Sequence, residues 1–315
     1  MRQAQRPLSP GWVAGSVRAR NMLARRLGWE QARALASAGS LANGISALAG
    51  GAYGRFVRPG LDLGGAQRGC ARTALWHIRV LAGWLPPRAL EPVRALVAWF
   101  ELVNVEDRLA YLVGPARGGP LGPPFELGGL ATVWPLIGSA QSAADVRRVL
   151  AGSRWGDPGA DDPVTVGLGL RLAWGRRVID DVPEAAAWAS GAVGLLLARE
   201  LLLSEREPSR LAARRPPGVG EVWERAADPP SLRRALPAQA GWSLAGIEVA
   251  ADLWRGEAAW WRRVQRDAAL LARDPHLGRP AVVGSITLLA VDAWRVAAAL
   301  ACAARGGTGT FEEIA

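Results

Sequence analysis

The residues that most often do chemistry in proteins are scarce in this sequence. Its two histidines, His77 and His276, stand far apart, and all 38 basic residues are arginines. Without lysine there is neither a P-loop, whose lysine binds phosphate, nor an amine for Schiff-base chemistry. No G-x-S-x-G motif is present, and no G-x-G-x-x-G motif follows a predicted strand. Acid–base and nucleophilic sites therefore have few candidate residues, and we predict no intrinsic ATPase, nuclease or lyase activity.

Carboxylates and cysteines remain as possible metal ligands, but their spacing does not favour a site. Neither histidine has a neighbour at the spacing of a zinc site. The cysteines, Cys70 and Cys302, lie in apolar or small-residue surroundings, which favours reduced, buried thiols. Two aspartate pairs are each followed closely by a proline, which predicts turns rather than metal-binding helices: Asp161–Asp162 and Asp180–Asp181.

The positive charge is concentrated near the N-terminus. The net charge of the chain is +10, and residues 1–114 hold 15 arginines against 6 acids, whereas the remaining residues are almost neutral. Such an excess indicates either a solvated surface or an anionic partner. The candidate partner-binding arginines flank the opening helix: Arg18, Arg20, Arg25 and Arg26.

A fifteen-residue stretch occurs twice in related form. It reads SLANGISALAGGAYG at 40–54 and SAADVRRVLAGSRWG at 142–156, with Tyr53 facing Trp155. In each copy a serine (Ser40, Ser142) precedes apolar residues with helical spacing, which predicts an N-capped short helix. The glycines that follow, Gly50 and Gly152, stand where a helix is expected to end.

A third copy is predicted at DPPSLRRALPAQAGW. Asp228 takes the capping position, a proline follows it, and Trp242 stands near the aromatic position. The three copies predict three related units, with Ser40, Ser142 and Asp228 at equivalent N-caps around a pseudo-threefold axis.

Long apolar helices are predicted after each copy, within 88–113, 183–203 and 280–304. No alternating β-strand pattern appears, so the fold class is all-α. Joints rich in proline and glycine divide the chain into three helical bundles, which we place at 1–114, 115–215 and 216–315. The longest uncharged runs are shorter than a bilayer crossing requires, so no transmembrane span is expected, and the N-terminal segment lacks the apolar region of a secretory signal.

The first third resembles a known family. AGSVRARNMLARRL is followed by SLANGISALAGGAYG and by a long helix ending FELVNVEDRLAYLVG, in which Glu101 and Asn104 form an acid-x-x-Asn pattern. This order is similar to the C/d family of V-type (vacuolar and archaeal-type) ATPases, the rotor-connecting component of the central stalk. The last helix and the FEEI tail resemble the C-terminus of that family. On the last helix, however, Asp292 and Arg295 stand where the family has Glu and Asn.

The resemblance implies three pseudo-symmetric bundles arranged as a funnel. It also implies a non-catalytic role that needs no cofactor, on the cytoplasmic face of the membrane, linking the central stalk to the proteolipid ring for proton or sodium transport. Glu101 and Asn104 then join the four arginines as candidate partner-binding residues, and no nucleic acid is expected. The alternatives are an Arg-rich all-α nucleic-acid-binding protein and, with less support, an all-α terpenoid-cyclase-like enzyme, which needs Asp-rich metal motifs.

Overall fold

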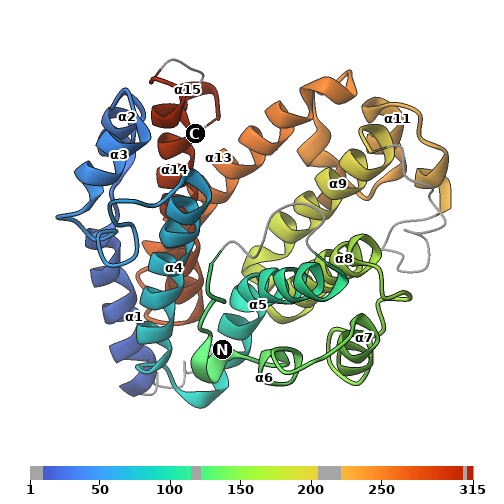
Figure 1. Ribbon diagram of the computed structural model, residues 1–315, viewed down its shortest axis with the longest axis horizontal. Coiled ribbons are helices and arrows are strands. Elements are labelled where there is room, and N and C mark those ends of the chain that lie inside the picture. The colour runs from blue at the N-terminus through green and yellow to red at the C-terminus, as the bar shows by residue number, and fades with distance from the viewer. Residues whose placement is uncertain (1–9, 115–121, 205–220, 308–310, 315) are drawn as a thin grey trace, which may run out of the picture. The chain divides into compact units, whose positions relative to one another are not determined.

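The computed structural model describes residues 10–114, 122–204, 221–307 and 311–314 (Figure 1). Within these ranges every regular element is helical and there is no β-strand, which confirms the predicted all-α class. The α-helices are α1 (Pro10–Met22), α2 (Trp29–Ala36), α3 (Leu41–Leu48), α4 (Leu63–Ala82), α5 (Leu90–Val113), α6 (Trp134–Ile137), α7 (Ala143–Ala151), α8 (Pro163–Asp181), α9 (Ala186–Leu202), α11 (Pro229–Ala235), α12 (Ala238–Gly241), α13 (Leu253–Ala272), α14 (Arg279–Ala304) and α15 (Phe311–Ile314).

One order of elements occurs three times along the chain. A short capped helix is followed by a helix of about twenty residues and then by a long apolar helix. A proline lies at or just before the first turn of each long helix. The three series are α3–α4–α5, α7–α8–α9 and α11–α13–α14. The prolines are Pro87, Pro183 and Pro280, each in the first turn of a helix, where the missing amide hydrogen costs nothing.

Each copy of the sequence repeat contributes to a different hydrophobic cluster. The apolar residues on the inner face of each short helix are buried. They are Ile45 and Leu48 in the first cluster, Val146 and Leu150 in the second, and Leu232 and Leu236 in the third. Leu41 and Val149, which the helical spacing also singles out, are half-buried.

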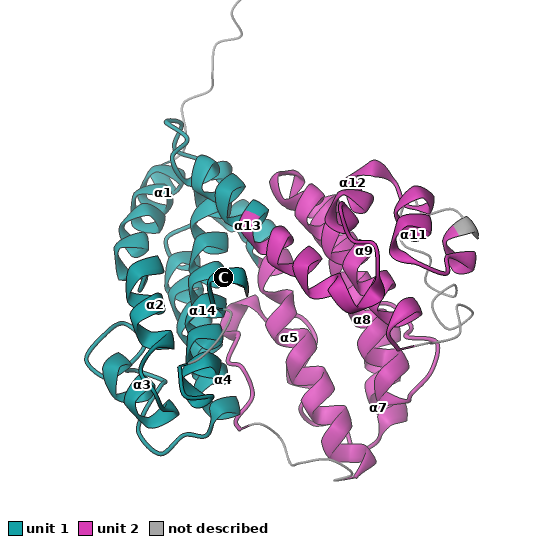
Figure 2. Ribbon diagram, turned by 90° about the horizontal axis from the view of Figure 1, so that it is seen from above, with its two compact units in different colours: residues 1–93, 263–313, 315 teal, residues 94–262, 314 magenta. Residues whose placement is uncertain are grey.

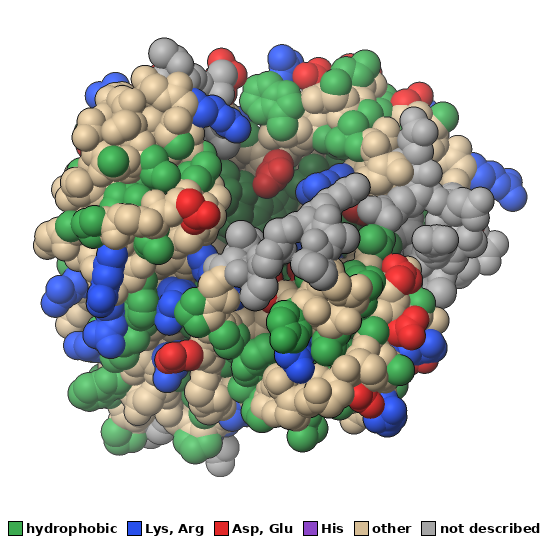
Figure 3. All heavy atoms as spheres, in the orientation of Figure 1, with side chains coloured by type: hydrophobic (Ala, Val, Ile, Leu, Met, Phe, Trp, Pro, Cys, Tyr) green, Lys and Arg blue, Asp and Glu red, His purple; other side chains and the backbone are tan. Residues whose placement is uncertain are grey.

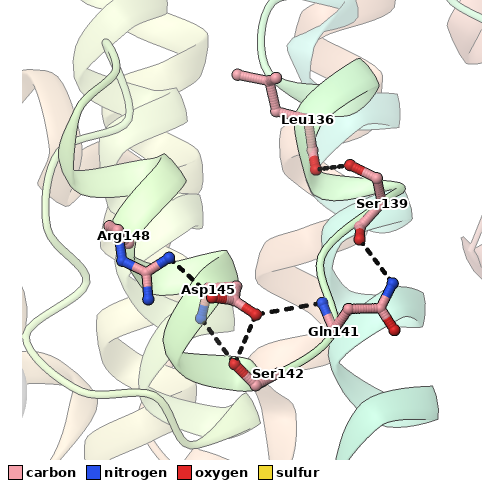
Figure 4. A network of polar contacts seen from close by, with 6 residues as sticks. All are labelled: Leu136, Ser139, Gln141, Ser142, Asp145 and Arg148. Carbon is pink, nitrogen blue, oxygen red and sulfur yellow. Dashed lines mark hydrogen bonds and ion pairs between the residues drawn. The ribbon is translucent and has the colours of Figure 1, made fainter.

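The predicted N-caps are confirmed in all three copies. The side chains of Ser40, Ser142 and Asp228 accept hydrogen bonds from the backbone N–H groups three residues on. In the second copy (Figure 4) the Ser142 hydroxyl also donates to Asp145, whose carboxylate pairs with Arg148 at 2.8 Å. These bonds satisfy N–H groups that a helix cannot bond internally.

The glycine that ends the first two copies is required for two different reasons. At Gly54 a Cβ atom would lie 2.0 Å from the carbonyl oxygen of Ala49, so only glycine fits beneath the preceding helix. At Gly156 the backbone has a φ of 71°, a conformation that strains other residues. Gly152 is the C-cap of α7 as predicted, whereas the C-cap of α3 is Ala49, one residue before Gly50.

The packed chain consists of two compact units (Figure 2). Unit 1 comprises residues 1–93, 263–313 and 315, and unit 2 comprises residues 94–262 and 314. Unit 1 therefore joins the helices α1–α4 with α14, which packs along α1, α2, α3 and α4.

The predicted bundle boundaries differ from these unit boundaries. The first of them, after residue 114, follows the end of α5, and the second, after residue 215, lies outside the described residues. The long helices do not pack mainly with the repeat copy that precedes them in the chain, as the predicted bundles imply. Each contributes to the cluster of the next copy: α5 to the second, α9 to the third, and α14 to the first.

By length and hydropathy alone, the segments Pro183–Leu202 and Arg279–Ala304 could cross a membrane. In the described structure most of the apolar window of α14 is buried, and so is a little under half of the window in the first segment. Burial inside a helical cluster explains why α14 is apolar nearly all round.

We predict that Ser142→Ala lowers the free energy of unfolding by about 1 kcal/mol, because it removes the cap of α7. The midpoint of urea unfolding measures this. Ser139→Ala is the matched control, because the Ser139 hydroxyl is exposed and only donates to the carbonyl of Leu136 within its own turn. Equal midpoints for the two variants would contradict the capping role.

Candidate functional site

Glu101, singled out by the sequence, lies on α5 and is 1 % exposed. Its Oε1 accepts the backbone N–H groups of Thr132, Val133 and Trp134 at 2.7–2.9 Å. Its Oε2 accepts the Thr132 hydroxyl and, at 3.2 Å, the indole Nε1–H of Trp155. Five donors thus converge on one carboxylate, and two of the backbone groups belong to the N-cap and first residue of α6.

Asp292 makes a closely similar set of bonds within unit 1. It lies on α14, and its two oxygens accept the backbone N–H groups of Leu27 and Gly28 at 2.8 and 2.9 Å. The Tyr53 hydroxyl donates to Oδ2 at 2.7 Å. Gly28 is the N-cap residue of α2, so this carboxylate also satisfies free amides at the start of a short helix.

The two networks explain the aromatic position of the repeat. Tyr53 and Trp155 face each other in the sequence comparison, and each donates from its ring to the buried carboxylate of a long helix. Each carboxylate binds amides of the segment that precedes the repeat copy. The copies are therefore alike in their polar contacts as well as in their apolar positions.

In the third copy the corresponding aromatic residue, Trp242, bonds a backbone carbonyl. There the Trp242 indole Nε1–H donates to the backbone carbonyl of Ala187, next to the start of α9, at 3.2 Å. Two glycines of α9 let this segment approach closely. A Cβ atom at Gly191 would lie 2.5 Å from the Trp242 ring, and one at Gly194 would lie 2.9 Å from the carbonyl oxygen of Ala240.

The residues three positions after the carboxylates differ. The Asn104 side chain bonds both backbone groups of Phe125, donating to the carbonyl at 2.8 Å and accepting from the amide at 2.7 Å. Arg295 instead donates to Gln265, and its guanidinium lies 5.5 Å from the centre of the Trp29 ring. Burial lowers the pKa of Arg295.

These contacts correct the expectation that Glu101 and Asn104 bind a partner. Both side chains are buried and bonded within unit 2, so neither reaches the surface. A carboxylate that accepts five hydrogen bonds also has no free lone pair for a metal ion or for proton transfer. The geometry gives both residues a structural role.

The four candidate arginines separate into two groups. Arg18, Arg25 and Arg26 are exposed. Arg20 is half-buried, and it donates to the carbonyl of Ala272 at 3.2 Å and to that of Asp274, which caps the C-terminal end of α13. The sequence pattern could not separate these roles, because they depend on which residues α1 meets in unit 1.

An aromatic–arginine surface lies beside the exposed arginines. The Arg18 guanidinium lies 5.9 Å from the Trp84 ring, and that of Arg55 lies 4.8 Å from the Trp76 ring. Burial lowers the pKa of the neighbouring His77, with a further contribution from Arg25 and Arg18. His77 is therefore held neutral by its surroundings and adds no charge to this surface at neutral pH.

The remaining candidates have structural positions. Cys70 and Cys302 are free and buried, as predicted. Asp162 caps α8 by accepting the Thr165 amide. Asp180 and Asp181 end α8 instead of forming the predicted turn, and Asp181 pairs with Arg177. Among the described residues, no group of three or more His, Cys, Asp or Glu side chains is placed to hold a metal ion.

No protein-family model matches the chain, and no curated protein matches it. The described residues thus offer two buried carboxylate networks and one exposed basic surface as the features on which a function can be argued.

We predict that Glu101→Gln and Asp292→Asn each lower the free energy of unfolding by about 3 kcal/mol or more. Each change replaces one acceptor oxygen by an NH2 group, which cannot accept a hydrogen bond. At least one buried N–H group is then left without an acceptor. Tyr53→Phe, which removes a single donor, costs about 1 kcal/mol. Urea unfolding of the full chain measures all three, and Thr132→Val is the mild control for Glu101. Wild-type stability of the Glu101→Gln variant would show that the network is dispensable.

A second prediction concerns alkaline pH. Burial raises the pKa of Cys70 to about 12, and burial together with Asp292 raises the pKa of Tyr53 well above its usual value. Both groups keep their protons in the folded state at a pH at which the unfolded chain loses them. The contribution of Cys70 therefore falls above about pH 8.5 and that of Tyr53 above about pH 10, each by about 1.4 kcal/mol for each further pH unit.

Because the chain has no lysine, few other groups titrate in this range. We expect Cys70→Ala to make the free energy of unfolding less steep between pH 9 and 12, in a series of urea-unfolding curves. Tyr111→Phe is the control, because that tyrosine is exposed. Parallel pH profiles for the wild type and Cys70→Ala would exclude a buried, protonated thiol.

Proposed function

We propose that this chain is a non-catalytic coupling subunit of a V-type rotary ATPase, linking the central stalk to the membrane proteolipid ring. The observation that supports the proposal best is the threefold repetition of one element order, in which the last helix, α14, completes the cluster of the first copy. A subunit that transmits torque needs stiffness, and a chain whose two ends pack into one core resists local opening.

The internal contacts of the acid-x-x-Asn pattern are consistent with this role. Glu101 and Asn104 fix the segments that precede the second copy, and Asp292 does the same for the first. In the proposed arrangement the three series form pseudo-symmetric bundles around a socket for the stalk, on the cytoplasmic face of the membrane. Torque transfer requires shape and rigidity, so the scarcity of catalytic groups is compatible with it.

One observation favours the alternative of nucleic-acid binding. Arg55 lies over both Trp76 and Phe56, and Arg72 lies over Phe56 at 5.0 Å, so arginines and aromatic rings share a surface of unit 1. Bases stack on such rings and phosphates bind arginine. The test below separates the two functions.

We predict that the tagged full chain, purified from detergent-solubilised membranes of its source, brings down the stalk and proteolipid subunits of a rotary ATPase in fixed ratio. Mass spectrometry identifies the subunits, and nuclease treatment before elution tests for nucleic acid. Added ATP should be hydrolysed by the complex and not by the chain alone. Recovery of nuclease-sensitive nucleic acid without these subunits would replace the proposal by its alternative.

A further inference from the structure

Two apolar side chains are exposed on the solvent-facing side of α1. Gly11 and Gly15 face the turn after α4, where Cβ atoms would lie 3.3 Å from Pro86 and 2.4 Å from Leu85. On the opposite side, one turn apart, Val13 and Val17 are 38 % and 46 % exposed. A surface helix of a globular protein normally presents polar residues there. The exposed valines are thus left unexplained by the packing of unit 1.

Positive charge borders this apolar face. Arg18 follows Val17 directly, and Arg25 and Arg26 are exposed just beyond the end of the helix. Trp84, at the turn that α1 packs against, is 52 % exposed and lies beneath the Arg18 guanidinium. In Figure 3, hydrophobic and arginine side chains lie next to one another on the side where Figure 1 shows α1.

The net positive charge of the chain is confined to unit 1, the unit that contains α1. Unit 1 contains 19 arginines and 8 carboxylates, a net charge of +11, whereas unit 2 contains 19 arginines and 20 carboxylates, a net charge of −1. Charge complementarity therefore favours an anionic partner for unit 1, and the exposed valines favour one that also accepts apolar side chains.

We propose that α1 docks unit 1 onto the surface of an anionic phospholipid bilayer. Val13 and Val17 enter the boundary between headgroups and acyl chains, where their burial is favourable. The guanidinium groups of Arg18, Arg25 and Arg26 bind lipid phosphates, which match the arginine fork.

A bilayer fits these residues better than a nucleic acid does. Both partners supply phosphates for the arginines, but only the bilayer offers an apolar environment to the two valines. Replacement of the valines therefore distinguishes the partners. The proposal stands independently of the rotary-ATPase proposal, because vesicle binding is a property of the isolated chain.

The test is flotation of the purified full chain with vesicles of phosphatidylcholine alone or with added phosphatidylglycerol, over a salt series. We expect binding only to the anionic vesicles, weakening as salt screens the charges. The double variant Val13→Ser, Val17→Ser should lose about tenfold in affinity. Arg18→Gln with Arg25→Gln should lose about fivefold per arginine and show a shallower salt dependence.

Matched controls come from unit 2. Arg233→Gln with Arg234→Gln removes two exposed arginines, and Leu136→Ser removes a side chain that is more exposed than either valine. Both should bind like the wild type. Circular dichroism and urea unfolding confirm that each variant is folded.

Three results would overturn the proposal. They are the absence of binding to anionic vesicles, unchanged binding by the folded valine variant, and equal losses in the unit 2 controls. Binding of a single-stranded oligonucleotide that is unaffected by the valine changes, with no vesicle binding, would assign the surface to nucleic acid instead.

Discussion

The structure depends on buried carboxylates that accept several hydrogen bonds at once. A carboxylate in an apolar core is costly unless it accepts hydrogen bonds, and Glu101 and Asp292 accept five and three of them. Because those donors belong to one short segment and one aromatic ring, each carboxylate fixes both against a long helix. Two of the three repeat copies are positioned in this way.

The long helices connect the copies, because each contributes to the cluster after its own. This arrangement makes α14 indispensable to the first cluster, so the N-terminal helices lack a complete core until the C-terminal helix is in place. The polar pair Asp292 and Arg295 differs from Glu101 and Asn104 in its second member. Asp292 retains the carboxylate contacts, whereas Arg295 meets Gln265 and the Trp29 ring in place of a backbone amide.

The surface and the core have separate chemical characters. The groups that are buried and titratable, such as Cys70 and Tyr53, stabilise the fold by keeping their protons. The exposed charged groups of the α1 face are arginines, which keep their charge throughout. A surface of this kind suits an anionic partner, and it separates the proposed docking face from the residues that maintain the fold.

The sequence by itself determined the helical class, the three capped short helices and the burial of their apolar residues, because caps and periodicity act within a few residues. It also singled out Glu101 and Asn104 as a pattern. Only the tertiary structure showed that both are internal, that Arg20 caps α13 whereas Arg18 stays exposed, and that Tyr53 and Trp155 donate to carboxylates. Those roles depend on contacts between residues far apart in the chain, which local spacing does not specify.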